Sequence, residues 1–190
     1  MSTEFITEYH PNGNKFVEGY YDGFNPAGDF TMWYENGNKH WEGFDVNCDD
    51  SLYMSTSWYE SGQIMDKGEM HLLIWKTGLW TEWHENGNKR SEGHYLGKIK
   101  SFSDFDKTDE DENPRIGEWH YWHSNGQLAC TGSHKDYRVD GLWVFWDEAG
   151  NKIHEHVYRE IELLELWGNL KVSWCSNELI NKYKQLNIVS

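Results

Sequence analysis

The chain has 190 residues, of which 37% are hydrophobic and 16% are aromatic, including 12 Trp and 11 Tyr. This composition favours an extended β-structure that buries flat rings over a fold with a thick aliphatic core. The formal charge of −15 argues against nucleic acid and anionic membrane surfaces as partners and favours a basic partner.

The first residues, Met-Ser-Thr-Glu-Phe, contain no basic segment followed by an apolar one, and no apolar run in the sequence has membrane-spanning length. The three cysteines, Cys48, Cys130 and Cys175, lie far apart and show no metal-ligand spacing. We therefore expect a cytoplasmic protein with reduced thiols.

One pattern recurs six times: an aromatic run, a turn glycine, a polar run and a closing glycine. It is clearest from Gly78 to Gly93, where Asn86-Gly87 separates the two runs. Asn-Gly in this setting predicts a β-hairpin with a two-residue type I′ turn. The turn glycines are spaced by 24, 25, 25, 39 and 24 residues, a period typical of stacked hairpin units. They are Gly13, Gly37, Gly62, Gly87, Gly126 and Gly150.

The turn position predicts the register within each hairpin. In the fourth unit Trp83 should face Arg90, and Trp80 should face Gly93, so that the ring covers the glycine opposite it. The third unit has serine in place of the ring, and the sixth has histidine in place of the glycine, as expected where an array ends. The corresponding pairs are Ile6 with Gly19, Phe30 with Gly43, Ser55 with Gly68, Trp119 with Gly132, and Trp143 with His156.

Strand alternation places rings on both faces of these hairpins. Along the sixth unit, Trp143 and Phe145 share one face, whereas Val144 and Trp146 share the other. We therefore predict an all-β fold, a single-layer antiparallel meander of about six repeated β-hairpins that occupies residues 1–158.

Two segments depart from the repeat. Residues 101–114 are acidic, poor in apolar side chains and end in proline, which predicts a solvated insertion loop where a basic partner could bind. Residues 159–190 predict a short capping segment that is partly helical, with Ser176 or Asn177 as the N-cap. Within this boundary region, residues 157–167 fit either a strand or a helix.

The motif Gly-x-Trp-x-x-Trp-x-x-Asn-Gly, with a closing Gly-x-Tyr-x-Gly at Gly93-His94-Tyr95-Leu96-Gly97, resembles the MORN-repeat variant of YwqK-type bacterial antitoxins. The resemblance covers residues 5–158 or so. It implies an antitoxin or immunity protein of a toxin–antitoxin system, whereas plain MORN arrays are implied to be protein-binding or lipid-associated scaffolds. The motif residues are structural, so the resemblance implies no catalytic residue.

The ten histidines raise a metal hypothesis, which their positions do not favour. His10, His84 and His123 occupy one position of the repeat, and His120 and His123 fall on opposite strand faces, so convergence of three or four ligands is not expected. No nucleophile elbow, phosphate-binding loop or His-Glu-x-x-His helix is present. We therefore expect no metal, no cofactor and no enzymatic activity.

A curved sheet with more rings than it can bury should present some of them beside acidic residues, where they anchor a protein partner. We expect a non-enzymatic inhibitor, an antitoxin or immunity protein, that occludes a basic toxin or effector domain. The alternatives are a MORN-like scaffold or adaptor for protein assembly, and a phage or mobile-element protein that inhibits a host defence factor. Open edge strands also allow a homodimer. The candidate partner-binding residues are Asp104, Asp106, Asp109, Glu110, Asp111, Glu112, Trp83, Trp122, Trp146 and Tyr95.

Overall fold

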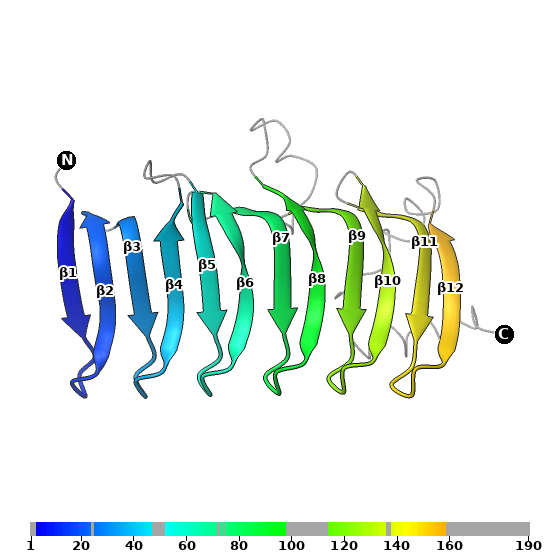
Figure 1. Cartoon of the computed structure of the whole chain (residues 1–190), viewed down its shortest axis with the longest axis horizontal. Helices are drawn as coiled ribbons and strands as arrows, with labels where there is room; N and C mark the ends of the chain where they lie inside the picture. The colour runs from blue at the N-terminus through cyan, green and yellow to red at the C-terminus, as the bar shows by residue number, and fades with distance from the viewer. Residues whose placement is uncertain are drawn as a thin grey trace, which may run out of the picture.

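The structure, a computed structural model, describes residues 3–23, 25–46, 52–71, 73, 75–97, 114–135 and 138–158. These residues form one open sheet of 12 antiparallel strands, in which each strand pairs with its neighbours in the chain (Figure 1). The strands are β1 Glu4–Tyr9, β2 Lys15–Asp22, β3 Asn25–Trp33, β4 Lys39–Asp45, β5 Leu52–Trp58, β6 Ile64–His71, β7 Trp75–Trp83, β8 Lys89–Leu96, β9 Arg115–Trp122, β10 Leu128–Lys135, β11 Arg138–Trp146 and β12 Lys152–Tyr158. The predicted all-β meander of six hairpins is confirmed.

The turns differ from the predicted type I′. In the fourth hairpin the Gly87 amide donates to the His84 carbonyl at 2.8 Å, and the His84 amide donates to the Asn88 carbonyl at 2.8 Å. Gly87 has a φ of 88°, whereas Leu73 is the one non-glycine with positive φ among the described residues, so Asn86 keeps a negative φ. The loop is therefore the three-residue type, a type I turn followed by a glycine with positive φ. The two-residue prediction was wrong because a type I′ turn needs positive φ at asparagine as well.

The register beyond the turn nevertheless follows the prediction. Trp83 pairs with Lys89 and not with Arg90, but Glu82 pairs with Ser91, so Arg90 is an extra residue in a bulge. This bulge offsets the longer loop, and Trp80 faces Gly93 as predicted. The same compensation occurs in all six hairpins, and the five other predicted pairs are also observed.

These paired positions form one row across the sheet, and its rings are buried on what we call the ring face. Phe30, Trp80, Trp119 and Trp143 are at most 2% exposed. Two of the rings cover a different glycine from the one predicted: Trp80 lies over Gly68 and Trp119 over Gly93. Trp143, which was predicted to face His156, covers Gly132. Each of these glycines belongs to the preceding hairpin, whereas Phe30 covers Gly43 within its own hairpin.

Hydrogen bonds of the indole groups explain this direction. The Trp80 Nε1–H donates to the Glu69 carbonyl at 2.8 Å, one residue beyond Gly68. Trp119 and Trp143 donate in the same way, to the carbonyls of His94 and Ser133, both at 3.2 Å. A buried indole N–H needs such a partner. The preceding hairpin supplies one for all three rings, and Trp80 also donates to the Thr77 carbonyl of its own strand at 3.2 Å.

The third hairpin meets its neighbour differently. In place of a ring it has Ser55, which is 1% exposed and accepts a hydrogen bond from the Trp41 Nε1–H at 2.7 Å. The other contacts between successive hairpins have a glycine with positive φ two residues before the ring position, such as Gly78 with a φ of 64°. The third hairpin has Tyr53 at this position. The β6–β7 ladder shifts register beside Gly78, whereas the β4–β5 ladder is regular. This hairpin therefore joins its predecessor without the bulge used elsewhere.

A second set of contacts ties each turn to the next hairpin. The residue that precedes each turn donates from its side chain to the carbonyl of the tryptophan in the following hairpin. Asparagine side chains of one turn also donate to a carbonyl of the next turn, as Asn86 and Asn88 do to Ser124 at 2.6 and 2.8 Å. The side-chain donors before the turns are His10, Tyr34, Tyr59, His84 and His123, at 2.7–2.9 Å from the carbonyls of Trp33, Trp58, Trp83, Trp122 and Trp146.

Several expectations fall outside the described residues: the acidic insertion, apart from Pro114, and the capping segment 159–190. Cys48 and Cys175 also lie outside the described residues. Cys130 is 1% exposed and disulfide-bonded, which contradicts the expectation of a reduced thiol at this position. Within the described ranges, no helix has the length and apolar character needed to cross a membrane.

Candidate protein-binding face

The face opposite the buried rings, here called the ladder face, carries a row of partly exposed tryptophans next to the turns. Lysines from the preceding hairpin lie over three of these rings, with Nζ 5.2–5.5 Å from the ring centroid. Each of these lysines also pairs with a glutamate three residues later, as Lys89 does with Glu92 at 2.6 Å. The row therefore combines flat rings with cation–π contacts. Its members are Trp33, Trp58, Trp83, Trp122 and Trp146.

Trp83 and Trp146 differ from the other three rings in what lies beside them. The lysine position of the preceding hairpin is occupied by Ile64 before Trp83 and by Leu128 before Trp146. Ile64 is 39% exposed. These two steps of the row are apolar rather than cationic, which suits contact with an apolar side chain of a partner.

A second row of exposed apolar side chains crosses the ladder face towards the strand ends away from the turns. Phe5 pairs with Tyr20 across the first hairpin, and Leu142 pairs with Val157 across the last. Between the two rows lie threonines and charged side chains, such as Thr81 opposite Glu92. The members of the second row are Phe5, Tyr20, Phe44, Leu79, Leu142 and Val157, which are 47–54% exposed.

The structure brings together some of the sequence-predicted site residues and separates others. Trp83, Trp122 and Trp146 share the ladder face and are partly exposed. Tyr95 lies on the ring face at 5% exposure, with its ring 5.0 Å from that of Trp119. Asp104, Asp106, Asp109, Glu110, Asp111 and Glu112 lie outside the described residues. The second row was missed, although its signal, an apolar residue next to the ring-row position in β1, β2, β4, β7, β11 and β12, is present in the sequence.

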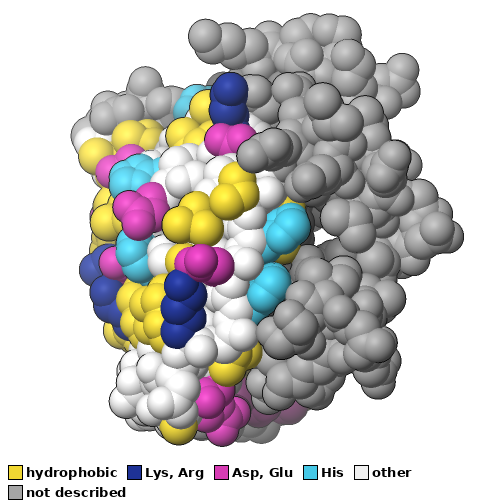
Figure 2. Space-filling view, turned by 90° about the vertical axis from the view of Figure 1, so that its right-hand side faces the viewer, with side chains coloured by type: hydrophobic (Ala, Val, Ile, Leu, Met, Phe, Trp, Pro, Cys, Tyr) yellow, Lys and Arg dark blue, Asp and Glu magenta, His cyan; other side chains and the backbone are white. Residues whose placement is uncertain are grey.

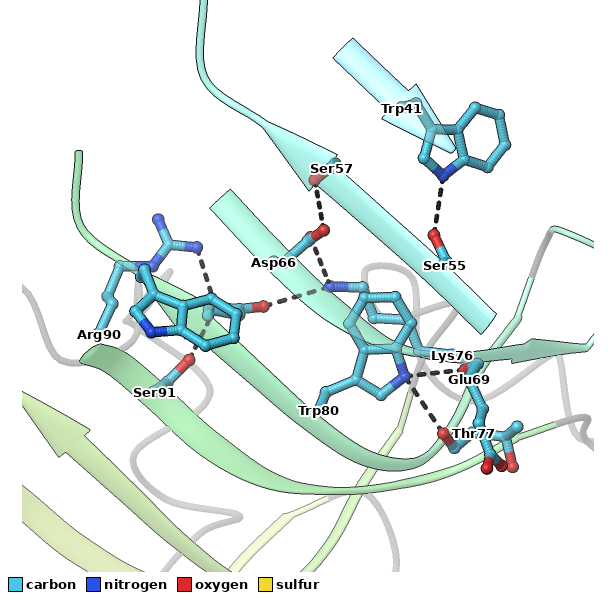
Figure 3. A network of polar contacts seen from close by, with 12 residues as sticks. Trp41, Ser55, Ser57, Asp66, Glu69, Lys76, Thr77, Trp80, Arg90 and Ser91 are labelled. Atoms are coloured by element: carbon cyan, nitrogen blue, oxygen red, sulfur yellow. Dashed lines mark hydrogen bonds and ion pairs between the residues drawn. The ribbon is translucent and has the colours of Figure 1, made fainter. Parts of the chain in front are cut away.

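A network of charged side chains occupies the ring face between β5 and β8 (Figure 3). Lys76 Nζ lies 3.3 Å from Asp66 and 3.2 Å from Glu82, and it lies over the Trp80 ring at 4.1 Å from the centroid. Glu82 also accepts hydrogen bonds from Arg90 at 2.9 Å and from Ser91 at 2.7 Å. Ser57 donates to Asp66.

The charges in this network hold one another ionised. Burial alone would raise the pKa of Glu82, but Lys76, the Ser91 hydroxyl and Arg90 outweigh it and lower the pKa to about 2. Burial acts against the charge of Lys76 as well, yet Asp66 and Glu82 raise its pKa. Because each charge faces an opposite one, the network stabilises the pairing of four adjacent strands.

The histidines serve the packing of the sheet. His134 is 5% exposed, and burial together with the charge of Arg115 lowers its pKa to about 3. His154 and His156 stack on one side of β12, with ring centroids 6.2 Å apart. Across the part of the chain that the structure covers, no group of three His, Cys, Asp or Glu side chains could hold a metal ion. Figure 2 shows the β12 end of the sheet, where hydrophobic, acidic, basic and histidine side chains are intermixed.

The fold and the repeated links between units define the class of the protein: an open-sheet β-hairpin repeat protein. A family model described as MORN repeat variant matches residues 76–96, which span β7, β8 and the turn between them. The chain thus carries a MORN repeat variant in its fourth hairpin. No curated protein matches the chain.

Proposed function

We propose that the chain is a non-enzymatic protein-binding inhibitor, an antitoxin or immunity protein that occludes a basic toxin or effector domain. The observation that carries the proposal is the ladder face, where two rows of exposed or partly exposed apolar side chains cross the sheet. Exposed apolar surface bordered by polar side chains marks protein interaction sites in soluble proteins.

The charge of the chain supports a basic partner. Four lysines of the ladder face are already paired with glutamates. The chain as a whole still has many more acidic than basic groups, which gives it a net charge of −15. Such an excess steers a basic domain to the surface and disfavours nucleic acid and anionic lipid as ligands. In this proposal the protein acts in the cytoplasm and needs no cofactor.

The test is co-expression with the protein encoded by the adjacent gene, followed by growth measurement and pull-down. The wild-type chain should rescue growth and form a salt-sensitive complex. The variant Leu79→Ser/Leu142→Ser removes two residues of the second row, each about half exposed, and should lose both rescue and complex. Val46→Ser removes an equally exposed residue from the connection after β4, outside both rows, and should retain both.

A complex without any effect on growth would favour the scaffold or adaptor function instead. A phage or mobile-element inhibitor would use the same face, and its partner would be a host defence factor rather than the neighbouring gene product. If neither toxicity nor a complex is observed with the neighbouring protein, the inhibitor proposal fails.

A further inference from the structure

The outer edge of β1 is a second candidate for partner contact. β1 lies at one end of the sheet, so none of the described strands pairs with its outer edge. Five of its six residues are exposed, among them Tyr9 at 61%. An exposed strand edge is a template for pairing with a strand of another molecule.

The contacts between internal hairpins show which groups a strand edge offers to the strand that pairs with it. In the second hairpin the Trp33 ring lies under Lys15, and the Trp33 carbonyl accepts a hydrogen bond from His10 at 2.9 Å. The Glu35 carbonyl in the turn accepts hydrogen bonds from Asn12 at 2.7 Å and from Asn14 at 2.9 Å. Each hairpin thus offers its predecessor a ring, a strand carbonyl and a turn carbonyl.

The first hairpin has the same three groups. Tyr9 stands at the position of Trp33, and Pro11 stands at the position of Glu35. The strand carries Glu4 and Glu8 and no basic residue. Ile6 takes the place of the ring-row aromatic, so an incoming strand needs no glycine opposite it.

We propose that the outer edge of β1 binds a strand or hairpin of a basic partner protein by strand addition. A lysine of the partner lies over the Tyr9 ring, and side-chain N–H donors of the partner reach the carbonyls of Tyr9 and Pro11. Glu4 and Glu8 attract the basic strand. This contact adds a second surface to the proposed protein-binding function and does not depend on the ladder face.

A second copy of the chain fits this edge poorly. At the other end of the sheet, Asp147 replaces the His or Tyr donor and accepts hydrogen bonds from the amides of Ala149 and Asn151 in its own loop, at 3.0 and 2.8 Å. Ala149 also stands where four of the other turns have an asparagine donor, as at Asn12. Pairing of two β1 edges would bring Glu4 and Glu8 of both copies together, and like charges across strands are destabilising.

The test uses a synthetic hairpin with the sequence of residues 75–97, whose two strands are cross-linked at their ends. This segment presents His84, Asn86, Asn88 and Lys89 to the next hairpin of the intact chain. The substitutions Glu85→Lys and Glu92→Lys make the probe basic. Binding to the full-length protein is followed by NMR at low salt, with backbone amide shifts as the readout.

We expect shifts at residues 4–11 and an affinity that falls about tenfold in the protein variants Tyr9→Ala and Glu8→Lys. The controls are Val46→Ser, an exposed apolar residue outside both rows and away from β1, and Glu148→Lys, an exposed acid in the last turn; both should bind like wild type. A probe carrying His84→Ala and Lys89→Glu should bind more weakly.

Three outcomes overturn the inference: shifts at β12 or on the ladder face with β1 unmoved, no binding at about 1 mM probe, or concentration-dependent β1 shifts without probe, which would assign the edge to a second copy. If the probe fails while growth rescue succeeds, this edge contact is wrong and the proposed function stands. If growth rescue fails while the probe binds, the proposed function is wrong and this edge contact stands.

Discussion

At the scale of single residues, the contact between a ring and a glycine is the smallest unit that holds the hairpins together. A Cβ added at Gly93 would overlap the Trp119 indole, which is fully buried. The ring cannot move away without breaking its hydrogen bond to the His94 carbonyl. Gly68, Gly93 and Gly132 are therefore each required by a tryptophan of the following hairpin.

We expect Gly93→Ala to lower the free energy of unfolding by about 3 kcal/mol, the upper end of the usual cost of overpacking. Gly117→Ala is the comparison, because Gly117 has a φ of 65° but open space around its Cβ position. It should cost about 1 kcal/mol from backbone strain alone. Urea unfolding measures both variants; an equal or reversed order would contradict the ring contact as the main cause.

Glu82 should make stability depend on pH in the acid range. Its pKa is about 2 in the folded chain and near 4.5 when unfolded, so its stabilising contribution is complete above pH 4.5 and is lost as the pH falls towards 2. A shift of this size corresponds to about 3 kcal/mol. We expect Glu82→Gln to lose about this amount at pH 7.

The difference in unfolding free energy between wild type and Glu82→Gln should shrink as the pH falls from 4.5 to 2, since wild-type Glu82 then becomes neutral as well. Glu85→Gln, at an exposed turn position, serves as the control and should match wild type throughout. A difference that does not change with pH would show that the carboxylate charge is not what stabilises the network.

At the scale of the strand and the hairpin, the sequence predicted pairings well and contacts between hairpins poorly. Glycine and ring positions recur in register, and a hairpin is local, so Trp80 could be placed opposite Gly93 from the sequence. The Trp80 ring covers Gly68 and not Gly93 because its N–H bonds to a carbonyl of the preceding hairpin. The sequence pattern within one repeat does not predict that bond. The same applies to Glu82, whose partners come from its own strand β7 and from β8.

The third hairpin gives a test in which the repeat pattern and the structure disagree. The pattern suggests that Ser55→Trp restores a missing ring. In the structure Phe30 already covers Gly43 and Trp80 already covers Gly68, while Ser55 is 1% exposed and bonded to Trp41. We therefore expect Ser55→Trp to destabilise the chain by about 3 kcal/mol through overpacking.

Thermal or urea unfolding of Ser55→Trp gives the answer. Ile6→Phe, a substitution at the same repeat position on the edge strand, should be close to neutral because Ile6 is only partly buried. A gain in stability for Ser55→Trp would mean that the repeat pattern, and not the local packing, governs this joint.

At the scale of the whole molecule, the described strands form a one-dimensional array in which every hairpin pairs only with its neighbours. The sequence predicted the net charge and an excess of aromatic residues over what one sheet can bury. It did not predict which rings face outward, because strand alternation gives that answer only once the register is known. The network around Glu82 joins the third and fourth hairpins through Asp66, Lys76 and Glu82, and Ser57, Arg90 and Ser91 complete it from β5 and β8. An array of this kind should tolerate the loss of a unit if the register is kept.

Deletion of residues 63–87 tests this property. It joins Gly62 to Asn88 and creates a hairpin of β5 with β8 whose turn keeps the sequence of the repeat. Trp119 still covers Gly93, and Asp66, Lys76 and Glu82 leave together, so no buried charge remains without its partner. The shortened chain should fold, and its urea m-value should fall by about one sixth, because m scales with the surface exposed on unfolding.

Deletion of residues 63–88 removes one residue more, which turns every later side chain of β8 to the opposite face. That variant should not fold cooperatively, and equal behaviour of the two deletions would show that the chain does not fold as a register-dependent array.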